Sequence, residues 1–546
     1  MKFSSIIFAT ALLVISSVNA LDCSPENTEI YSEELDYSST LQDMIDEASR
    51  TKKPVVYLNP GLFTLDPVKP IVLRKGVSLK GDPYQPSILS VKDKNTTGTI
   101  EVYQDNQAWA IQDIVFENVN IQVQENTNED ETAILGNLFF NGQRGSIIAR
   151  YGEKLYIDGN VFLRDEAHAG HYTLPTYNTT NTGVLLQTQK NTVVSNNIFG
   201  MDLRKMENLV PYVSQQLRAP LRNLKFIHEC LKRNLDDEQG YLASGLQLYA
   251  TNDITIKENI LNATFPDTKP ISQDHAISVV GSNQTYITEN FIAGWQIADF
   301  GGAVRFTSAV KYFNICRYTL ISYAITSFIL QVDGYVISNY LANTGVMMYA
   351  AVHADYKQVS NIVVHKNFLY RFLGKEVAVP EELDGWLYEG VTFFDFYTAR
   401  LNYTVRPPIW NSSVPISPWG WHIVVSDNKF GATKGVDPNV ISLGNLDPTE
   451  GYFDRKNCYV TEPLVAGSKN AEVVPLLWRQ TYEQGKFSKN GGKIPMKLVH
   501  HTDDDLNDQI PAQLRNLKIP EFWKAFTLKN DTVPMLSPDT PCYKSS

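Results

Sequence analysis

Four residues that can perform acid and base chemistry lie between positions 274 and 305. They are Asp274, His275, Asp299 and Arg305. Elimination from an acidic sugar needs a cation that neutralises the carboxylate, a base that takes the C5 proton and an acid for the leaving oxygen. Arg305, His275 and a tyrosine such as Tyr249 can fill these three roles. Asp274, His275, Asp299 and Arg305 are therefore the candidate catalytic residues.

Two other interpretations of these residues remain open. Hydrolysis of a glycosidic bond needs two carboxylates flanking that bond, and Asp274 with Asp299 is the available pair. In a purely structural role, Asp274 and His275 would cap a turn and Asp299 would begin an ordinary Asp turn. Arg305 would then join a surface ion pair.

Short strands are expected to position these residues. Apolar side chains alternate with others in three consecutive strands, which predicts one inward and one outward set. The inward set is Leu246, Leu248, Ile277, Val279, Val304 and Phe306, and the outward set is Gln247, Tyr249, Ser278, Val280, Arg305 and Thr307. Stacked strands place outward residues in columns about 4.8 Å apart. We predict substrate-binding contacts in these columns and their continuation, at Gln247, Tyr249, Ser278 and His353, with Met347 and Tyr349 beside them.

A short sequence motif recurs along the chain, with β-branched residues followed by an asparagine where the strand must bend. Its copies carry Asn160, Asn197, Asn259, Asn290, Asn339, Asn367 and Asn428. Asparagine tolerates the left-handed backbone of a tight bend, and stacked copies can hydrogen-bond their amides as a ladder. Steps of 31, 24, 25 and 28 residues connect Asn259, Asn290, Asn314, Asn339 and Asn367, about one coil of three short strands. The repeat therefore predicts a solenoid of parallel strands.

The N-terminal end of this solenoid needs a cap. Residues 40–48 predict a short helix with Leu41, Met44, Ile45 and Ala48 on one face. The following segment, 54–81, resembles the first coil of the pectate-lyase-like superfamily, and the resemblance covers roughly Ser39 to Phe430. It implies an all-β fold, a right-handed parallel β-helix, to which the residues themselves add the N-terminal capping helix and a helical insertion.

The resemblance also implies activity on polysaccharides, as in polysaccharide lyases and polygalacturonases. Hydrolases of the superfamily typically carry an Asp-Asp dipeptide where this chain has Asp274-His275, so a lyase is favoured over a hydrolase. The aspartate cluster of the calcium-dependent lyases cannot be matched residue by residue. We therefore assign no cofactor and no metal site, and a need for calcium stays open.

Two insertions are expected to interrupt the coils. Residues 202–240 have an apolar helical stripe and many basic residues, which indicates either a packed helix with a solvated face or a glycan-binding wall. Residues 372–421 are rich in aromatic side chains, which can stack on sugars or pack against the solenoid, and part of this segment is a further coil. We expect the β-helix over 21–445, then an irregular tail, 446–546, that packs on it and contains one short helix around 472–482.

The N-terminus has the layout of a secretory signal. Residues 1–20 combine Lys2, an apolar run and the small-residue site Val18-Asn19-Ala20. We therefore expect a secreted, extracellular protein, without a membrane span and monomeric. Removal of Lys2 changes the formal net charge from −11 to −12. This acidic balance argues against a nucleic-acid partner.

Export also predicts modification and disulfides. Seven Asn-x-Ser/Thr sequons suit a glycosylated surface, namely Asn95, Asn178, Asn262, Asn283, Asn402, Asn411 and Asn530. Five cysteines allow one or two disulfides and a leftover thiol. We favour a bridge between Cys458 and Cys542 and expect Cys316, inside an apolar strand, to be free.

Three functions are compatible with these observations. The first is a secreted enzyme that cleaves or modifies an acidic polysaccharide. The second is a non-catalytic glycoprotein of the cell wall or extracellular matrix that binds glycans or serves as structure. The third is an adhesion factor that recognises host surfaces. A groove with converging titratable groups favours the enzyme, because fold alone does not determine function.

Overall fold

The structure is a computed structural model. It describes residues 36–52, 54–91, 96–103, 108–126, 132–142, 145–164, 182–200, 206–222, 242, 244–262, 275–295, 302–307, 309–312, 325–329, 331–350, 359–371, 391–395, 420–434, 441–444, 452–463, 473, 476–478, 481–483, 486–488, 494–495, 509–526 and 535–544. The predicted signal segment and residues Cys23, Cys230 and Cys316 lie outside these ranges.

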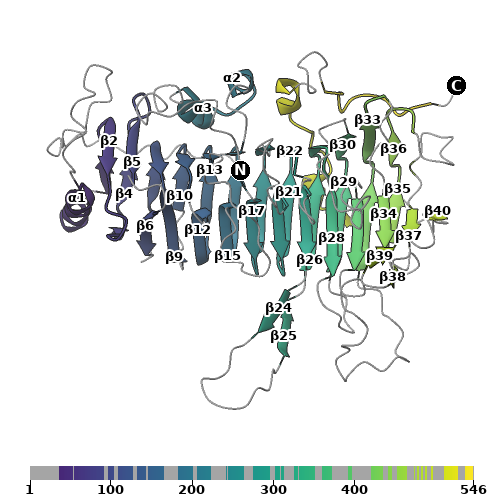
Figure 1. The fold of residues 1–546 in the computed structure, drawn as a ribbon, viewed down its shortest axis with the longest axis horizontal. Coiled ribbons are helices and arrows are strands. Elements are labelled where there is room, and N and C mark those ends of the chain that lie inside the picture. Colours follow the sequence, from purple (N-terminus) through teal and green to yellow (C-terminus); the bar gives the residue numbers. More distant parts are fainter. Residues whose placement is uncertain are drawn as a thin grey trace.

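Parallel strands stack along the long axis of the molecule, each lying across that axis, and form three faces (Figure 1). The first face contains β3 (Ile71–Leu73), β6 (Gly98–Tyr103), β9 (Val119–Asn126), β12 (Gly145–Glu153), the start of β15 (Thr182–Ser195), β17 (Ser244–Tyr249), β20 (Ile277–Val280), β23 (Val304–Thr307), β28 (Val346–Ala350), β31 (Val391–Asp395), β34 (Ile441–Gly444) and β37 (Leu476–Trp478). The second face contains β1 (Val55–Tyr57), β4 (Ser78–Lys80), β7 (Ala110–Gln112), β10 (Thr132–Leu135), β13 (Leu155–Asp158), the end of β15, β18 (Asn252–Lys257), β21 (Asn283–Thr288), β26 (Gln331–Ile337), β29 (Val359–His365), β32 (Gly420–Ser426) and β35 (Tyr452–Arg455). The third face contains β2 (Gly61–Thr64), β5 (Ser87–Ser90), β8 (Ile114–Glu117), β11 (Leu138–Phe140), β14 (Val161–Leu163), β16 (Ile198–Phe199), β19 (Ile260–Asn262), β22 (Phe291–Ala293), β27 (Tyr340–Ala342), β30 (Phe368–Arg371), β33 (Lys429–Ala432) and β36 (Cys458–Tyr459).

This architecture confirms the predicted right-handed parallel β-helix. Each coil adds one strand to each face, in the order first, second, third. The alternation of side chains is also confirmed in β17, β20 and β23, because the six predicted inward residues are fully buried in the core. Four phenylalanines stack inside the third face with ring centroids 4.6–5.0 Å apart: Phe116, Phe139, Phe162 and Phe199.

An asparagine ladder joins the coils at the bend between the second and third faces. Each side-chain amide donates to the side-chain oxygen of the next asparagine at 2.9–3.0 Å, through Asn137, Asn160, Asn197, Asn259, Asn290, Asn339, Asn367, Asn428 and Asn457. These side chains are almost completely buried. The predicted ladder is therefore confirmed, and the structure adds Asn137 and Asn457, which carry the same signal.

One predicted rung is wrong. Asn290 bonds directly to Asn339, so Asn314 is not a member of the ladder. The coil between them is longer than its neighbours because 308–330 inserts at the corner between the first and second faces. The antiparallel strands β24 (Ala309–Tyr312) and β25 (Ile325–Ile329) of this insertion project from the body of the helix (Figure 1).

The predicted capping helix is present as α1 (Ser38–Arg50) at the N-terminal end (Figure 1). Leu41, Ile45 and Ala48 are buried, and Met44 packs against the core. The amphipathic stripe therefore covers the apolar end of the first coil.

Helices and tail cover the outer side of the third face. In the expected helical insertion, α2 (Met206–Leu209) and α3 (Gln215–Arg222) bury Leu209 and Leu217 against it. Farther along the axis, Phe526, just after the 3-10 helix η6 (Glu521–Ala525), stacks on Phe291 with ring centroids 4.0 Å apart. The outer residues of this face thus belong to a second apolar cluster.

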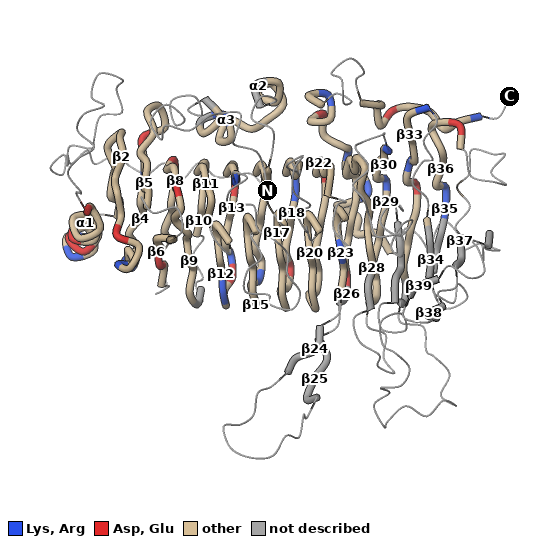
Figure 2. The backbone as a smooth tube through the Cα atoms, in the orientation of Figure 1, with Lys and Arg blue, Asp and Glu red and all other residues tan. Residues whose placement is uncertain are grey.

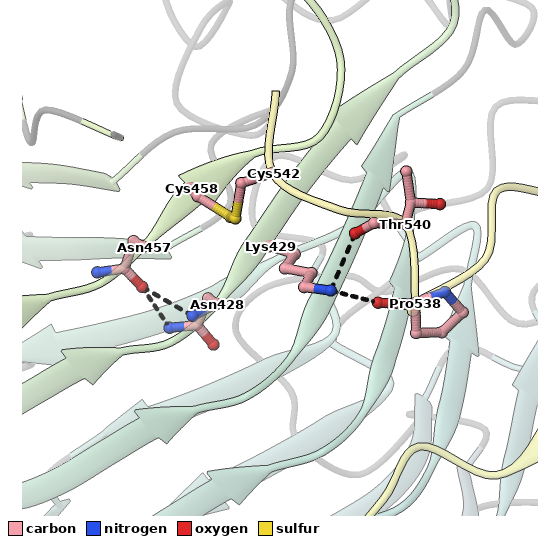
Figure 3. The surroundings of a disulfide bond; sticks show 7 residues. All are labelled: Asn428, Lys429, Asn457, Cys458, Pro538, Thr540 and Cys542. Carbon is pink, nitrogen blue, oxygen red and sulfur yellow. Dashed lines mark hydrogen bonds between the residues drawn. A yellow bond between two sulfur atoms is a disulfide. The ribbon is translucent and has the colours of Figure 1, made fainter. Parts of the chain in front are cut away.

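The tail is attached to the last coils by several bonds. Cys458 and Cys542 form the predicted disulfide. Lys429 Nζ donates to the carbonyl oxygens of Pro538 and Thr540 at 2.8 and 2.9 Å (Figure 3). An earlier tail segment, which includes η5 (Ala512–Leu514), packs on the second face at Ile337, Val363 and Val424 through Ile510 and Leu514.

Two boundaries differ from the sequence prediction. The coils do not end at 445, because β35 and β36 pair in parallel with β32 and β33. The segment 472–482 is not helical, since it contains β37 and the start of β38 (Thr481–Glu483), which pairs with β39 (Lys486–Ser488). Leu477 pairs with Leu443 of the preceding coil, so the apolar residues extend the first face. Leu476 and Leu477 also pair with β40 (Ile494–Pro495).

No helix within the described ranges is both long and apolar enough to span a membrane.

His365 lies beneath the tail on the second face. Its Nδ1 is 2.8 Å from Ser426 Oγ and 3.5 Å from the carboxylate of Asp427. Burial, followed by the charge of Lys366, lowers the pKa of the imidazole from 6.5 to about 4. The Asp427 carboxylate does not offset the burial, so the folded protein holds this ring neutral.

We expect His365 to make the protein less stable in acid. Its contribution is fully present above the unfolded pKa of 6.5 and is lost as the pH falls toward about 4, since only the unfolded chain takes up the proton. The loss is about 3 kcal/mol at most. Urea unfolding at about pH 7 and about pH 4.5 should show a smaller acid loss in His365→Gln than in the wild type. Equal losses in both proteins would contradict this role.

Candidate functional site

The outward side of the first face brings several predicted site residues together. Gln247, Ser278 and Arg305 occupy equivalent positions on β17, β20 and β23. Arg305 Nη2 donates a hydrogen bond of 2.8 Å to Ser278 Oγ. Because these strands are neighbours in the stack, three separate segments of sequence supply one continuous column.

This column is less open than the sequence suggests. Ser278 is fully buried and Gln247 is 2% exposed, whereas Arg305 and Tyr249 are half-buried. The guanidinium of Arg305 lies against the Ser278 hydroxyl, which fixes the orientation of the arginine. A guanidinium carries donors in a fork that matches a carboxylate.

His275 precedes β20 and does not share the outward column of Arg305. It stands two residues before the inward Ile277 and is fully buried. Its backbone oxygen accepts a 2.8 Å bond from Ser244 Oγ, and its ring lies against Gly302, where a Cβ would come within 2.8 Å of the ring. Its position suits packing at the corner between the third and first faces.

The other predicted residues are only partly placed. Asp274, Asp299 and His353 lie outside the described residues, as do the side chain of Tyr349 and most of the aromatic insertion 372–421. Met347 continues the column beside Arg305 and is 8% exposed. Within the insertion, β31 confirms the expected further coil, because it pairs with β28 and β34.

The same face extends toward the N-terminus, where the sequence analysis named no candidate site residue. The register continues the outward columns through Glu101, Gln122, Ile148 and Leu185, and through Tyr103, Gln124, Arg150 and Gln187. Tyr103 is 52% exposed, and its hydroxyl donates to Glu101 at 2.8 Å, a bond that raises the pKa of Tyr103. The signal was available, since these residues alternate with buried ones in the same way as in β17.

Insertions concentrate on the two borders of the first face. From β10 to β36, every connection from the second face to the third is two residues long. Connections that enter or leave the first face are far longer in several coils, at 164–181, 200–243, 263–276, 308–330 and 396–419. The first face therefore lies between two series of long connections, and segments that connect the elements of a rigid scaffold commonly carry binding and catalytic residues.

Neither the distribution of charges nor a cluster of metal ligands narrows the position of the site among the described residues. Figure 2 shows basic and acidic residues interspersed along the described backbone. Among the described residues, no group of three or more His, Cys, Asp or Glu side chains is placed to hold a metal ion.

Comparison with solved structures gives distant matches over most of the chain. The surface adhesin PfbA of Streptococcus pneumoniae is 12% identical, with a TM-score of 0.39, over 78% of this chain and 94% of the adhesin. The A-module of the Azotobacter vinelandii mannuronan C-5 epimerase AlgE4 is 11% identical, with a TM-score of 0.32, over 79% and 95%. The alginate lyase AlyF-OU02 is 11% identical, with a TM-score of 0.36, over 82% and 89%.

These likenesses concern the fold alone. No protein-family model and no curated protein sequence matches the chain.

Proposed function

We propose that this protein is secreted and binds an acidic polysaccharide along the outward side of its first face, where it cleaves or modifies the polymer. Elimination is favoured over hydrolysis. The observation that carries the proposal is the placement of the insertions, because both borders of this face, and not the bend between the other two, have long connections. Gln247, Ser278 and Arg305, from three consecutive coils, lie in the strip between them.

Coverage of the other faces supports the choice. Helices α2 and α3 and the tail pack on the third face, and the tail also packs on the later strands of the second face. Residues on the outward side of the first face belong to neither of these apolar clusters. A linear polymer can follow columns whose residues repeat at the spacing of the strands.

Arg305 gives the strip its preference for an acidic sugar. Its hydrogen bond to Ser278 orients the guanidinium, and a fork of donors pairs with a carboxylate in two parallel bonds. In an elimination the same pairing would neutralise the uronate while the C5 proton leaves. For the elimination, a tyrosine such as Tyr249 is the proposed acid for the leaving oxygen. Asp274 and Asp299 stay the proposed carboxylate pair for the alternative reaction, hydrolysis.

Incubation with polymers tests the reaction. The secreted protein is mixed with uronic-acid and neutral polysaccharides, with and without calcium, while unsaturated uronate absorbance and reducing ends are followed. A rise in both signals is expected with an acidic polymer. Reducing ends alone would replace elimination with hydrolysis.

We expect Arg305→Ala to weaken binding of an acidic oligosaccharide by about 10- to 100-fold, because it removes a charge-assisted hydrogen bond. Arg305→Lys keeps the charge without the fork of donors. Its affinity should lie between those of the wild type and Arg305→Ala. Lys257→Ala, which removes an exposed cation from the second face, is the matched control. Isothermal titration measures all four proteins, and equal affinities for wild type and Arg305→Ala would exclude this role.

The burial of His275 favours a second candidate, a non-catalytic glycan-binding protein. Because the imidazole is fully buried, it does not stand in the column with Arg305. Binding to acidic polymers that depends on Arg305, with no product from any polymer in the panel, would establish this alternative.

A further inference from the structure

The buried hydroxyl of Thr285 has no structural explanation. Thr285, in β21, is fully buried, and its Oγ1 has no hydrogen-bond partner among the described residues. A buried hydroxyl without a partner destabilises the folded state, and valine has nearly the same shape without this cost. Packing alone therefore favours valine at this position.

The neighbouring coils support this reading. The positions equivalent to Thr285 are Ile254 in the preceding coil and Gly334 in the following one, so neither neighbour offers a side-chain hydroxyl or amide. Thr192, which precedes Ile254 in the same column, bonds its hydroxyl to the carbonyl oxygen of Lys190 at 3.1 Å. Thr285 is thus a polar residue in an apolar part of the column.

Two residues before it, Asn283 is exposed at the start of β21, on the corner between the first and second faces. Gln284 between them is also exposed and has a φ of 50°, which turns the chain outward before it enters the core. Asn283-Gln-Thr285 is a sequon, in which the threonine is needed for modification of the asparagine. The same strand therefore combines an accessible acceptor with a hydroxyl that folding does not require.

We propose that Asn283 carries an N-linked glycan and that Thr285 is threonine for this reason. Asn283 Nδ2 forms a bond to the anomeric carbon of an oligosaccharide carried on a lipid diphosphate. The bond from that carbon to the diphosphate oxygen breaks, Nδ2 loses one proton, and the lipid diphosphate leaves. Because the folded protein buries Thr285, transfer precedes folding of this coil.

The glycan would stand on a corner, outside the core. Asn252, the register neighbour of Asn283, is half-buried on the same corner. This placement needs no rearrangement of the coils. It depends on export of the chain and not on any reaction at the first face.

Peptide mapping tests the modification. The full chain is secreted from a eukaryotic cell, and the peptide that contains Asn283 is analysed by mass spectrometry before and after peptide N-glycosidase treatment. We expect a glycan on Asn283 in the wild type and in Thr285→Ser, and none in Asn283→Gln or Thr285→Val. An unmodified Asn283 in the secreted wild-type protein would overturn the proposal.

Thermal unfolding separates the modification from a structural role of the hydroxyl. Asn283→Gln and Thr285→Val both lack the glycan, and only the first retains the hydroxyl. We expect Thr285→Val to unfold at the same temperature as Asn283→Gln or at a higher one. A clearly lower temperature for Thr285→Val would mean that the hydroxyl stabilises the fold, and the explanation of Thr285 would fail.

Discussion

Asn290→Ala is expected to destabilise the protein by about 3–6 kcal/mol, because it leaves two buried donors without an acceptor. The backbone and side-chain nitrogens of Asn259 both donate to Asn290 Oδ1, at 2.9 and 3.0 Å. The side chain of Asn290 also donates to Ile256 and to Asn339, and these bonds would be lost as well. Urea unfolding of the two proteins at neutral pH measures the difference.

Thr255→Ala is the matched control for this substitution. Thr255 lies on the outward side of β18, in the coil of Asn259, and is half-buried. Its truncation should change the free energy of unfolding by less than about 0.5 kcal/mol, as is usual for surface positions. If Asn290→Ala behaved like this control, the ladder would contribute little and the account of the bend would be wrong.

Cys542→Ser is expected to lower the free energy of unfolding by about 4–5 kcal/mol, since the disulfide closes a loop between residues 84 positions apart. The tail would remain attached by weaker bonds, such as those of Lys429 to Pro538 and Thr540 (Figure 3). Thermal unfolding and limited proteolysis of residues 535–544 measure the effect.

The double variant provides the control. Cys458→Ser should match Cys542→Ser, and the protein with both substitutions should be no less stable than either single variant, because only one bond is lost. Additive losses would show that the two cysteines stabilise the fold separately.

The coils could be predicted because each contains the same local sequence pattern. A β-branched strand with one apolar side and an asparagine at the bend recurs, so the ladder and the inward residues of β17, β20 and β23 followed from the sequence. Asn314 was misassigned because coil length alone counted it as a rung. An insertion of 23 residues, 308–330, resembles one further coil in length, and only the pairing of Asn290 with Asn339 distinguishes them.

The tail was harder to predict than the coils. Its contacts join residues far apart in sequence, such as Phe291 with Phe526, and no periodicity records them. The disulfide was an exception. Cysteines are few, and a bridge between Cys458 and Cys542, the last two in the sequence, was the simplest pairing. The segment 472–482 has apolar residues that suit either a helix or a strand, and pairing with β34 selects the strand.

For the site, the sequence predicted the column and not its exposure. Register placed Gln247, Ser278 and Arg305 side by side, as expected from alternation. Ser278 is buried and accepts a hydrogen bond from Arg305, and no pattern in the sequence specifies either fact. The burial of His275 could have been predicted, because His275 lies two residues before the inward Ile277 and alternate residues of a strand point to the same side.

The structure of the protein bound to an acidic oligosaccharide tests the central claim most directly. The account predicts a sugar chain along the outward side of β17, β20 and β23, with one carboxylate within hydrogen-bonding distance of the Arg305 guanidinium. An oligosaccharide bound to the second or third face, with the first face empty, would contradict it.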